Sequence, residues 1–536
     1  MRTVATAAFL LFGAAFNIWT LYWTDQIYTP FVTNDWLINY EGGFVRRGLA
    51  GQLLLHVASA THLPLWMLVF GLRAMLYGAI AVLTIRKLAG RLSLTGWIFV
   101  LSPVTFLFEV YDPGGAGRKE LLFLLVLAAN SLVLEKKAPR QAPLTPAYYA
   151  LLTLVLATGI LVHETFLFYL PLLLLQLASH GRLRESRLLA LPLAVSLLAF
   201  AAVSANKGSP ATVEHILRSL APLVPGISCA TNGGAICYLS STTADALAYV
   251  FVPEIGELLL IPMLILLGYS AVFLRSMSDA RAAGKPAGGA RDVELLLILA
   301  LLSLLPLFAV AVDYGRWIHV FVSGLFFALP RHVLVRGDGA PGRPHAKTTW
   351  LLVVLFSLSW SIIHTRANTF QPGALGRLAS AIPVARLLPK PAPLAAPLRF
   401  AAPGAVFRWK GCELPSAIGK PTAACAVEKR DRAEAGHLTY GPYEALPAGD
   451  YSVDIRYTSA EPTTDVPGTW DIAVVDPQGS TVLAQGPLEG SGAAVARVAA
   501  EFSIDAAHAM HLVEIRTVAY ADKSLQVESI ELRRLR

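Results

Sequence analysis

Carboxylates and arginines lie close together in the segment 33–48, which follows the first apolar run of the chain. This segment contains Asp35 and Glu41, a Gly-Gly pair, and the adjacent Arg46 and Arg47. A carboxylate beside arginines can act as a general base next to an anionic substrate. Asp35 and Glu41 are therefore candidate catalytic residues, and Arg46 and Arg47 are candidate phosphate ligands. The alternative is a structural salt bridge that orders the loop.

A glycine-rich turn opens directly into another apolar run. It reads Tyr111-Asp112-Pro113-Gly114-Gly115-Ala116-Gly117-Arg118-Lys119-Glu120. Glycines let a backbone approach a ligand closely, and a helix N-terminus with two cations favours an anion. Arg118 and Lys119 are candidate phosphate ligands, and Asp112 is a candidate acid, base or substrate contact. The alternative is a turn whose cations pair with Asp112 and Glu120. The spacing and the missing terminal Ser/Thr exclude a nucleotide-binding P-loop.

Two further polar pairs stand at the ends of apolar runs. His163 and Glu164 are adjacent, as in an acid/base or metal-binding pair; the alternative is that they satisfy each other or cap a helix. Arg316 suits bidentate recognition of a phosphate, and Trp317 suits an interfacial anchor or a stacking surface for a sugar. Asp313 is a candidate acid, base or substrate contact, unless it forms a structural pair with Arg316.

The elements that must position these residues are membrane-spanning helices. The chain has 536 residues, of which 55% are hydrophobic and 15% charged, whereas a soluble protein carries about 25% charged residues. Apolar stretches recur to about residue 365, near the length that crosses a bilayer. They predict about eleven spans, at approximately 4–24, 64–85, 94–110, 120–134, 147–162, 165–179, 188–205, 256–274, 293–311, 317–330 and 349–364. The first is interpreted as an uncleaved helix, because no small-residue cleavage site follows it.

Basic residues in alternate loops predict the orientation of these spans. Lysines and arginines cluster in every second loop, at 86–91, 136–140, 182–187, 275–291 and 331–347. By the positive-inside rule these loops and the N-terminus are cytoplasmic. The four polar segments and the C-terminal domain then lie outside a bacterial inner membrane, in the periplasm. The net charge of +8 resides mainly in these loops, so it does not indicate a nucleic-acid partner.

The four cysteines form two close pairs on the predicted outer side. Cys229 and Cys237 share one loop, and Cys412 and Cys425 lie near the start of the C-terminal domain. In an oxidising compartment this pattern predicts two local disulfides; the alternative is four thiols. Zinc is disfavoured, because the pairs lack CxxC spacing and companion histidines. No metal site is assigned and no cofactor is identified, although a divalent metal is compatible with the sequence.

The C-terminal part changes to short segments with alternating apolar residues. The predicted organisation is a transmembrane domain at 1–365, a linker at 366–405 rich in Pro, Ala and Arg, and an extracytoplasmic domain at 406–536. The strand-like runs are 451–457, 469–475, 481–484, 494–502, 511–520 and 525–532. They predict an antiparallel β-sandwich of jelly-roll type. Such a domain suits carbohydrate binding or acceptor positioning; the alternative is a cap that stabilises the membrane domain.

In layout the chain resembles the GT-C class of membrane glycosyltransferases, which use polyprenyl-phosphate sugars at the extracytoplasmic face. The resemblance rests on the architecture, on Asp35 in the first outside loop, and on arginines near the outer boundary. The segments 43–48 (GFVRRG) and 313–317 (DYGRW) are also similar to those of bacterial membrane proteins linked to surface polysaccharides. The segments 440–443 (YGPY) and 447–451 (PAGDY) are similar to sugar-binding jelly rolls appended to such enzymes.

This resemblance implies transfer of a sugar from a lipid-linked donor to a surface glycan or glycolipid, among membrane lipids. Asp35 would deprotonate the acceptor, and Arg118, Lys119 and Arg316 would hold the donor phosphate. Many GT-C enzymes have a second acidic residue paired closely with the first. Here Asp35 and Glu41 are separated in sequence and Asp25 is a further candidate, which leaves the base and metal dependence open.

Two other functions remain alternatives. A polysaccharide polymerase or ligase would use polyprenyl-pyrophosphate-linked chains, and the loop 206–255, with Lys207, His215 and Arg218, suits it. A lipid or glycan transporter or flippase would place polar residues near mid-membrane and show paired inverted repeats. The predicted spans are almost free of charge, with Arg73 and Glu109 as exceptions near their ends.

Overall fold

A computed structural model of the chain describes residues 2–26, 29, 31–112, 114–115, 117–137, 143–224, 226–229, 233–242, 247, 250, 255–336, 347–364, 370–375, 403–476, 479–505, 508 and 512–535. The chain divides into two compact units. The first comprises residues 1–227 and 232–382, and the second comprises 228–231 and 383–536. Most of the predicted linker, 366–405, lies outside the described residues.

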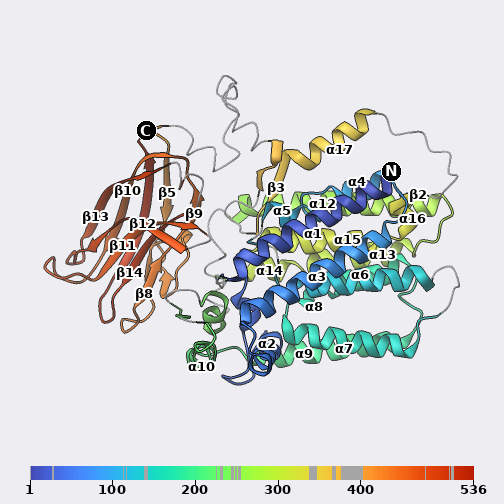
Figure 1. The fold of residues 1–536 in the computed structure, drawn as a ribbon, viewed down its shortest axis with the longest axis horizontal. Coiled ribbons are helices and arrows are strands. Elements are labelled where there is room, and N and C mark those ends of the chain that lie inside the picture. The colour runs from blue at the N-terminus through green and yellow to red at the C-terminus, as the bar shows by residue number, and fades with distance from the viewer. Residues whose placement is uncertain are drawn as a thin grey trace. The chain divides into compact units, whose positions relative to one another are not determined.

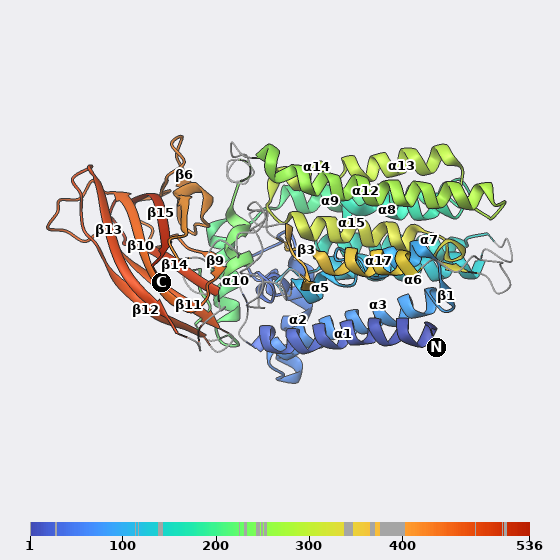
Figure 2. The ribbon, with the colours of Figure 1, turned by 90° about the horizontal axis from the view of Figure 1, so that it is seen from above.

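The first unit is helical, and its long helices run alongside one another (Figures 1 and 2). The helices before the predicted loop 206–255 are α1 (Arg2–Gln26), α2 (Gly48–Thr61), α3 (Leu65–Lys87), α4 (Leu94–Val100), α5 (Phe108–Tyr111), α6 (Glu120–Lys137), α7 (Pro146–Val162), α8 (Phe166–Ser179) and α9 (Ala190–Ala205). Helix α10 (Pro210–Leu220) lies within that loop. After it come α12 (Ile255–Ala282), α13 (Ala290–Leu302), α14 (Leu305–Val310), α15 (Tyr314–Ala328), α16 (Arg331–Leu334) and α17 (Lys347–Ser359). Short 3-10 helices cover Asn34–Leu37 (η1), Arg187–Leu189 (η3) and Gly234–Ser240 (η4).

The helical unit contains two small two-stranded sheets, of which only the first joins distant parts of the chain. Strand β1 (Arg91–Leu92) pairs antiparallel with β2 (Val335–Arg336), and β3 (Trp360–Ile362) pairs antiparallel with β4 (Phe370–Pro372). The second pair lies within the predicted last span and linker. The described chain after α17 therefore continues as a strand, and the helix expected over 349–364 ends at Ser359.

Five helical segments of the described chain are long and apolar enough to cross a membrane. They are 6–26, 65–87, 187–205, 259–282 and 290–310, and they match predicted spans. Two shorter apolar helices, α7 and α8, match two more. These segments support a helical membrane unit, whereas the full set of eleven spans remains an expectation.

The predicted span 94–110 is interrupted. Helix α4 ends at Val100, and the chain passes through turns before α5 starts at Phe108. Pro103 lies in the break, where it cannot donate the amide hydrogen bond that a continuous helix needs. Thr105 instead turns its hydroxyl to the carbonyl of Phe99. The break matters for the site, because it brings Glu109 to the interior as part of a short helix.

Helix α15 is the central helix of this unit, since every one of its residues is buried. It packs against α6, α8 and α12. Small residues permit the close approach: a Cβ at Gly324 would meet the side chain of Leu172 at 2.7 Å. An all-round buried helix is normally apolar, yet α15 carries Arg316 and His319. Their polar groups must therefore be met by partners inside the unit.

The second unit consists of two antiparallel sheets. One has the order β13-β10-β15-β7-β6 with β5 also paired to β15, and the other has the order β12-β11-β14-β8 with β9 also paired to β14. The strands are β5 (Val406–Lys410), β6 (Gly419–Pro421), β7 (Val427–Lys429), β8 (Gly436–Thr439), β9 (Pro442–Ala445), β10 (Gly449–Thr458), β11 (Gly468–Asp476), β12 (Gly479–Leu488), β13 (Val495–Ile504), β14 (Leu512–Ala519) and β15 (Gln526–Arg534).

Buried and less buried side chains alternate along these strands, and the buried ones form a shared core. Tyr451, Val453 and Ile455 of β10 are buried together with Ile472 of β11 and Ile515 of β14. Side chains from both sheets therefore meet in one apolar layer, as in a β-sandwich. All six predicted strand-like runs correspond to β10–β15.

Both predicted disulfides are present. Cys412 and Cys425 are bonded, with their Cα atoms 4.9 Å apart. Cys229 and Cys237 are also disulfide-bonded, and no cysteine of the chain is free. The pairing expected from sequence proximity is confirmed.

A lysine ammonium joins three backbone segments at the edge of the sandwich. The Nζ of Lys429 donates to the carbonyl oxygens of Arg432 at 2.8 Å, Tyr520 at 2.6 Å and Lys523 at 3.0 Å. An ammonium has three donor hydrogens, so these contacts use its full capacity. The loop after β7 is thereby fixed to the loop between β14 and β15.

Candidate functional site

Four segments far apart in sequence bring charged side chains together in the helical unit. They are the loop around η1, the turn before α6, the turn between α7 and α8, and the start of α15. Lys119 Nζ lies 3.9 Å from Asp35 Oδ1, and Arg47 bridges Asp35 and Glu164. Arg316 Nε lies 3.3 Å from Glu120 Oε1. These contacts join residues of all four segments into one cluster.

Asp35 is a buried carboxylate, 2% exposed, whose oxygens accept no hydrogen bond from any described residue. Its nearest cations are Arg47 Nη1 at 3.8 Å and Lys119 Nζ at 3.9 Å. Burial alone would raise the pKa of Asp35, but the charges of Lys119 and Arg47 outweigh it and hold the pKa below its usual range. Asp35 is therefore ionised at neutral pH and keeps its lone pairs available for a ligand.

Arg47 organises the neighbouring carboxylates. Its Nε and Nη2 donate to Glu164 at 2.9 and 2.5 Å, in a forked arrangement. Arg47 caps α2 with a left-handed backbone, φ 67°. Arg46 lies farther out, with Nη1 3.9 Å from Glu164. Burial would raise the pKa of Glu164, but Arg47 and His163 lower it well below its usual value.

The glycine turn before α6 is held by residues of three other segments. Trp36 Nε1 donates to the carbonyl of Gly117 at 2.9 Å, and the Gly117 amide donates to the Tyr77 hydroxyl at 2.8 Å. Gly117 has φ +70°, and a Cβ there would overlap the guanidinium of Arg73. Arg73 in turn is paired with Asp25 in the interior. Only glycine fits this position, and the turn is thereby fixed next to Asp35.

The two cations of this turn point in different directions. Lys119 is fully buried, and its Nζ donates to the Arg47 carbonyl at 3.0 Å. Arg118 donates to the carbonyl of Phe31. Burial lowers the pKa of Lys119 to about 8 and that of Arg118 to about 10. Neither cation forms an ion pair with Asp112, which pairs with His364, whereas the charge of Glu120 acts on both.

Glu120, Arg316 and His163 form a second buried group. Glu120 is 3% exposed, with Oε1 4.0 Å from His163 Nε2 as well as 3.3 Å from Arg316. Arg316 also donates to Asp313 at 2.9 Å. His163 does not pair with Glu164; its Nδ1 lies 2.7 Å from the Thr165 hydroxyl. Burial lowers the pKa of His163 to about 4, so its imidazole is neutral at pH 7.

Two predicted site residues lie apart from these contacts. Asp112 accepts from the His364 amide at 2.5 Å and pairs with its ring at 2.7 Å. It thereby ties the glycine turn to the chain after β3. Glu41 is exposed and accepts a hydrogen bond from Gln52 at 2.9 Å. Asp35, rather than Glu41, is the acidic residue of the first loop that the structure places among the cations.

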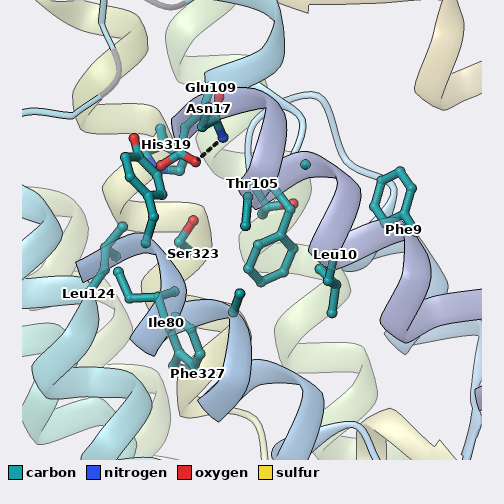
Figure 3. Close-up of a pocket in the computed structure, with 15 residues that line it drawn as sticks. Phe9, Leu10, Asn17, Ile80, Thr105, Glu109, Leu124, His319, Ser323 and Phe327 are labelled. Carbon is teal, nitrogen blue, oxygen red and sulfur yellow. Dashed lines mark hydrogen bonds and ion pairs between the residues drawn. The ribbon is translucent and has the colours of Figure 1, made fainter. Parts of the chain in front are cut away.

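Two cavities meet next to this cluster. The smaller is lined by Gly115, Gly117, Arg118, Glu120 and Arg316 among others. The larger lies between α1, α3, α6 and α15 and is lined mainly by apolar side chains. Glu109, Leu124 and His319 line both. In Figure 3, Asn17, Glu109 and His319 gather together, while Leu10, Ile80 and Phe327 line the rest.

Sequence reasoning missed the polar residues at this junction. Asn17 donates to Glu109 at 2.8 Å, and His319 Nε2 lies 3.9 Å from Glu109. Glu109 was recognised only as a charge near the end of a predicted span. His319 follows Arg316 by three residues, which places both on one helix face. That spacing was the signal that could have found it.

The donor set does not form a conventional metal site. Among the described residues, no group of three or more His, Cys, Asp or Glu side chains is arranged to hold a metal ion. What the cluster offers instead is arginine charge at a cavity, from Arg118 and Arg316, with Lys119 and the ionised carboxylate of Asp35 in the same cluster. This arrangement can bind an anion and accept a proton from a neighbouring hydroxyl.

Comparisons with known proteins concern the second unit. No protein-family model matches the chain, and no curated protein matches it. The β-rich region resembles the C-terminal CBM6 of LamC, a marine laminarinase from Zobellia galactanivorans, and the carbohydrate-binding module CBM6cm-2 of Cellvibrio mixtus lichenase 5A, in complex with cellotriose. Each is 12% identical with a TM-score of 0.18, and the matches cover 24% of this chain and 99% and 98% of those chains. The likeness is too weak to assign a ligand.

Anion binding should weaken as pH rises through about 8. Lys119 is charged below its pKa of about 8 and neutral above it. Dodecyl phosphate keeps constant charge above pH 7.5, since its second pKa is about 6. Its affinity for the purified protein, measured by calorimetry from pH 7.5 to 9.5, should fall as Lys119 loses its proton.

Lys119→Arg provides the matched control, because an arginine stays charged throughout this range. Its affinity should remain level across the same titration. A native profile that is flat to pH 9.5, or an equal decline in Lys119→Arg, would show that Lys119 does not contribute its charge to the anion site.

Proposed function

We propose that the chain is a membrane glycosyltransferase, which moves a sugar from a polyprenyl-phosphate donor to a surface glycan or glycolipid. The observation that carries the proposal is the junction of the two cavities. A space lined by Arg118 and Arg316 continues into one lined by apolar helix faces, with shared walls at Glu109, Leu124 and His319. A molecule that suits both has a phosphate joined directly to a hydrocarbon chain.

The cations favour a phosphate at the smaller cavity. Arg316 has one guanidinium edge on Asp313, and its buried Nε lies 3.3 Å from Glu120 Oε1 in an ion pair that makes no hydrogen bond. The Nε of Arg118 is likewise buried without a hydrogen bond to any described residue. Buried donors without partners are unfavourable, and a phosphate oxygen would satisfy them. The sugar that the phosphate carries would then lie towards Asp35 and Lys119.

Asp35 is the proposed base. In the empty site its low pKa makes it a weak base, because Lys119 and Arg47 stabilise the carboxylate. A donor phosphate would offset those positive charges and so raise the affinity of Asp35 for a proton. The acceptor hydroxyl then gives its proton to Asp35 while its oxygen attacks the anomeric carbon. The bond between that carbon and the phosphate oxygen breaks, and arginines hold the departing lipid phosphate.

The proposal includes an orientation. The N-terminus is cytoplasmic, and the charged cluster and β-sandwich lie on the periplasmic side of a bacterial inner membrane. Two observations support this orientation: the basic loops predicted to be cytoplasmic and the two disulfides, which form in oxidising compartments. The donor is then made or flipped so that its sugar faces the periplasm.

The function is tested by turnover of purified protein with a panel of polyprenyl-phosphate sugars. The native chain should release polyprenyl phosphate, and Asp35→Asn should lower the rate by about 10²–10⁴-fold, because an amide cannot accept the proton. Asp279→Asn is the matched control: Asp279 is an exposed residue that pairs with Arg275. It should turn over like the native protein.

A different product would redirect the assignment. If the native chain releases no lipid phosphate but consumes lipid-pyrophosphate oligosaccharides, the polymerase or ligase function applies instead. If it turns over monophosphate donors and Asp35→Asn is equally active, the reaction class stands and Asp35 is not the base.

Filling the larger cavity should weaken donor capture. Gly13 of α1 lines this cavity, and a Cβ there would have its nearest contact at 3.9 Å, the Phe106 carbonyl. Gly13→Phe should therefore occupy space meant for the prenyl chain. The KM for a long-chain donor should rise about tenfold or more with little change in kcat, as expected when uniform binding is lost.

Gly268→Phe is the matched substitution on the exposed face of α12, where an added Cβ meets nothing within 4 Å. Its KM should equal that of the native chain. A normal KM in Gly13→Phe, measured with undecaprenyl-phosphate sugars, would place the prenyl chain elsewhere.

The β-sandwich is proposed to bind the acceptor glycan. Tyr443 is 41% exposed and its ring lies 6.4 Å from that of Tyr440. Exposed aromatic rings offer apolar faces on which sugars can stack. Tyr443→Ala in the full chain should lower retention on immobilised surface glycans by about threefold to tenfold. Tyr520, also 41% exposed, is the control; an equal loss in Tyr520→Ala would indicate a non-specific effect.

A further inference from the structure

The ring of His319 is held in one orientation. Its Nδ1 lies 3.1 Å from the Val104 carbonyl, and its face stacks on Phe108 with centroids 4.6 Å apart. A carbonyl can only accept, so Nδ1 carries a proton. The other nitrogen, Nε2, then holds a lone pair when the ring is neutral and a transferable proton when it is charged. It lies 3.9 Å from Glu109.

His319 lies where the two cavities share their walls. His319 and Glu109 line both the space next to Arg118 and Arg316 and the space between the apolar helix faces. Figure 3 shows both side chains at the polar end of the larger cavity, where Asn17 also donates to Glu109. A lipid phosphate bound with its phosphate at the arginines and its chain in the larger cavity would therefore pass His319.

We propose that His319 is a general acid that protonates the departing lipid phosphate, with Glu109 as the residue that positions and neutralises the charged ring. The proposal rests on the proposed transferase function and names a second catalytic residue for it. The two residues were absent from the site predicted from sequence, and they supply chemistry that the Asp35 cluster lacks.

The unfavourable free energy of an additional buried charge is the physical reason for a general acid. The donor is a phosphodiester with one negative charge, whereas an unprotonated leaving group would carry two. An additional buried charge is unfavourable without a new partner. Transfer of the Nε2 proton to a phosphate oxygen keeps the leaving group at one negative charge while its bond to the sugar breaks.

The step balances in atoms and protons. The acceptor oxygen bonds to the anomeric carbon, the bond from that carbon to the phosphate oxygen breaks, and its electron pair stays with the phosphate. Asp35 receives the acceptor proton, and His319 gives one to the phosphate. Asp35 then loses a proton to water and His319 regains one, so no other reactant is consumed.

Donor binding and proton uptake are coupled in this arrangement. Titratable groups around the ring are Glu109 on α5, Glu120 on α6 and Asp112 after α5, and the cations Arg118 and Arg316 line the smaller cavity. Burial disfavours an isolated imidazolium, and an adjacent phosphate anion favours it. The ring therefore takes up its proton together with the donor rather than before it.

Two substitutions separate proton transfer from packing. His319→Asn retains an amide that can donate to Val104 and lacks Nε2, whereas His319→Gln places an amide without a transferable proton near the Nε2 position. With undecaprenyl-phosphate glucose or arabinose as donor, whichever the native chain uses, both should lower kcat by about 10²–10³-fold. His215→Gln, at an exposed residue of α10, should retain native turnover.

Two measurements test whether His319 acts as the general acid: turnover of a donor analogue, and the number of protons taken up on donor binding. When sulfur replaces the oxygen between the sugar and phosphorus, the departing group is less basic, so His319→Asn should slow turnover by less than tenfold relative to the native chain. Calorimetry in buffers of different ionisation enthalpy should show proton uptake when the native protein binds its donor near pH 7.5. That uptake should be absent in His319→Asn and reduced in Glu109→Gln.

The outcomes are distinguishable from those of the transferase proposal. Native protein that turns over no lipid-phosphate sugar overturns both. Native turnover with normal rates in both His319 variants, or an equal loss with the oxygen and sulfur donors, overturns the acid while leaving the transferase intact. Unchanged proton uptake in His319→Asn does the same.

Discussion

The helical unit is arranged around the need to compensate charges that are removed from water. Asp35, Lys119, Glu120 and Arg73 are each almost fully buried, and an isolated charge in such surroundings is strongly unfavourable. Every one of them lies within about 4 Å of an opposite charge. Those partners come from different segments, so compensation of charge also determines how the loops pack against the helix ends.

The phosphate and the hydrocarbon chain of the proposed donor would lie in different surroundings. Arginines and carboxylates provide fixed dipoles and charges near the helix ends, while α1, α3 and α15 provide an apolar space. A membrane protein must satisfy its polar groups internally, because lipid offers no hydrogen bonds. The interrupted segment between α4 and α5 is placed within the protein, where the Thr105 hydroxyl meets the Phe99 carbonyl and His319 meets the Val104 carbonyl. Asn17 donates to the carboxylate of Glu109 in the same region. The irregular backbone thereby creates the polar wall of an otherwise apolar cavity.

Sequence reasoning succeeded where a local pattern has a single physical meaning. Alternating residues marked β10–β15, close cysteine pairs marked the disulfides, and charges at the ends of apolar runs identified most of the buried cluster. It failed where tertiary contacts determine which residues are buried and where a helix is interrupted. Nothing local in the sequence distinguishes the exposed Glu41 from the buried Asp35, and the apolar run 94–110 hid the turn that brings Glu109 inside. His319 was not singled out by any sequence pattern, and only the fold sets it beside that carboxylate.

The lysine that joins three carbonyls in the β-sandwich has a consequence for how the domain depends on dissolved cations. Carbonyl clusters of this kind attract cations, and a diffusing ion would occupy such a position only in proportion to its supply. The Lys429 ammonium is tethered to its own strand, so its effective concentration is set by the chain. The two loops it connects are therefore held together by a positive charge that chelators cannot remove and that dilution does not deplete.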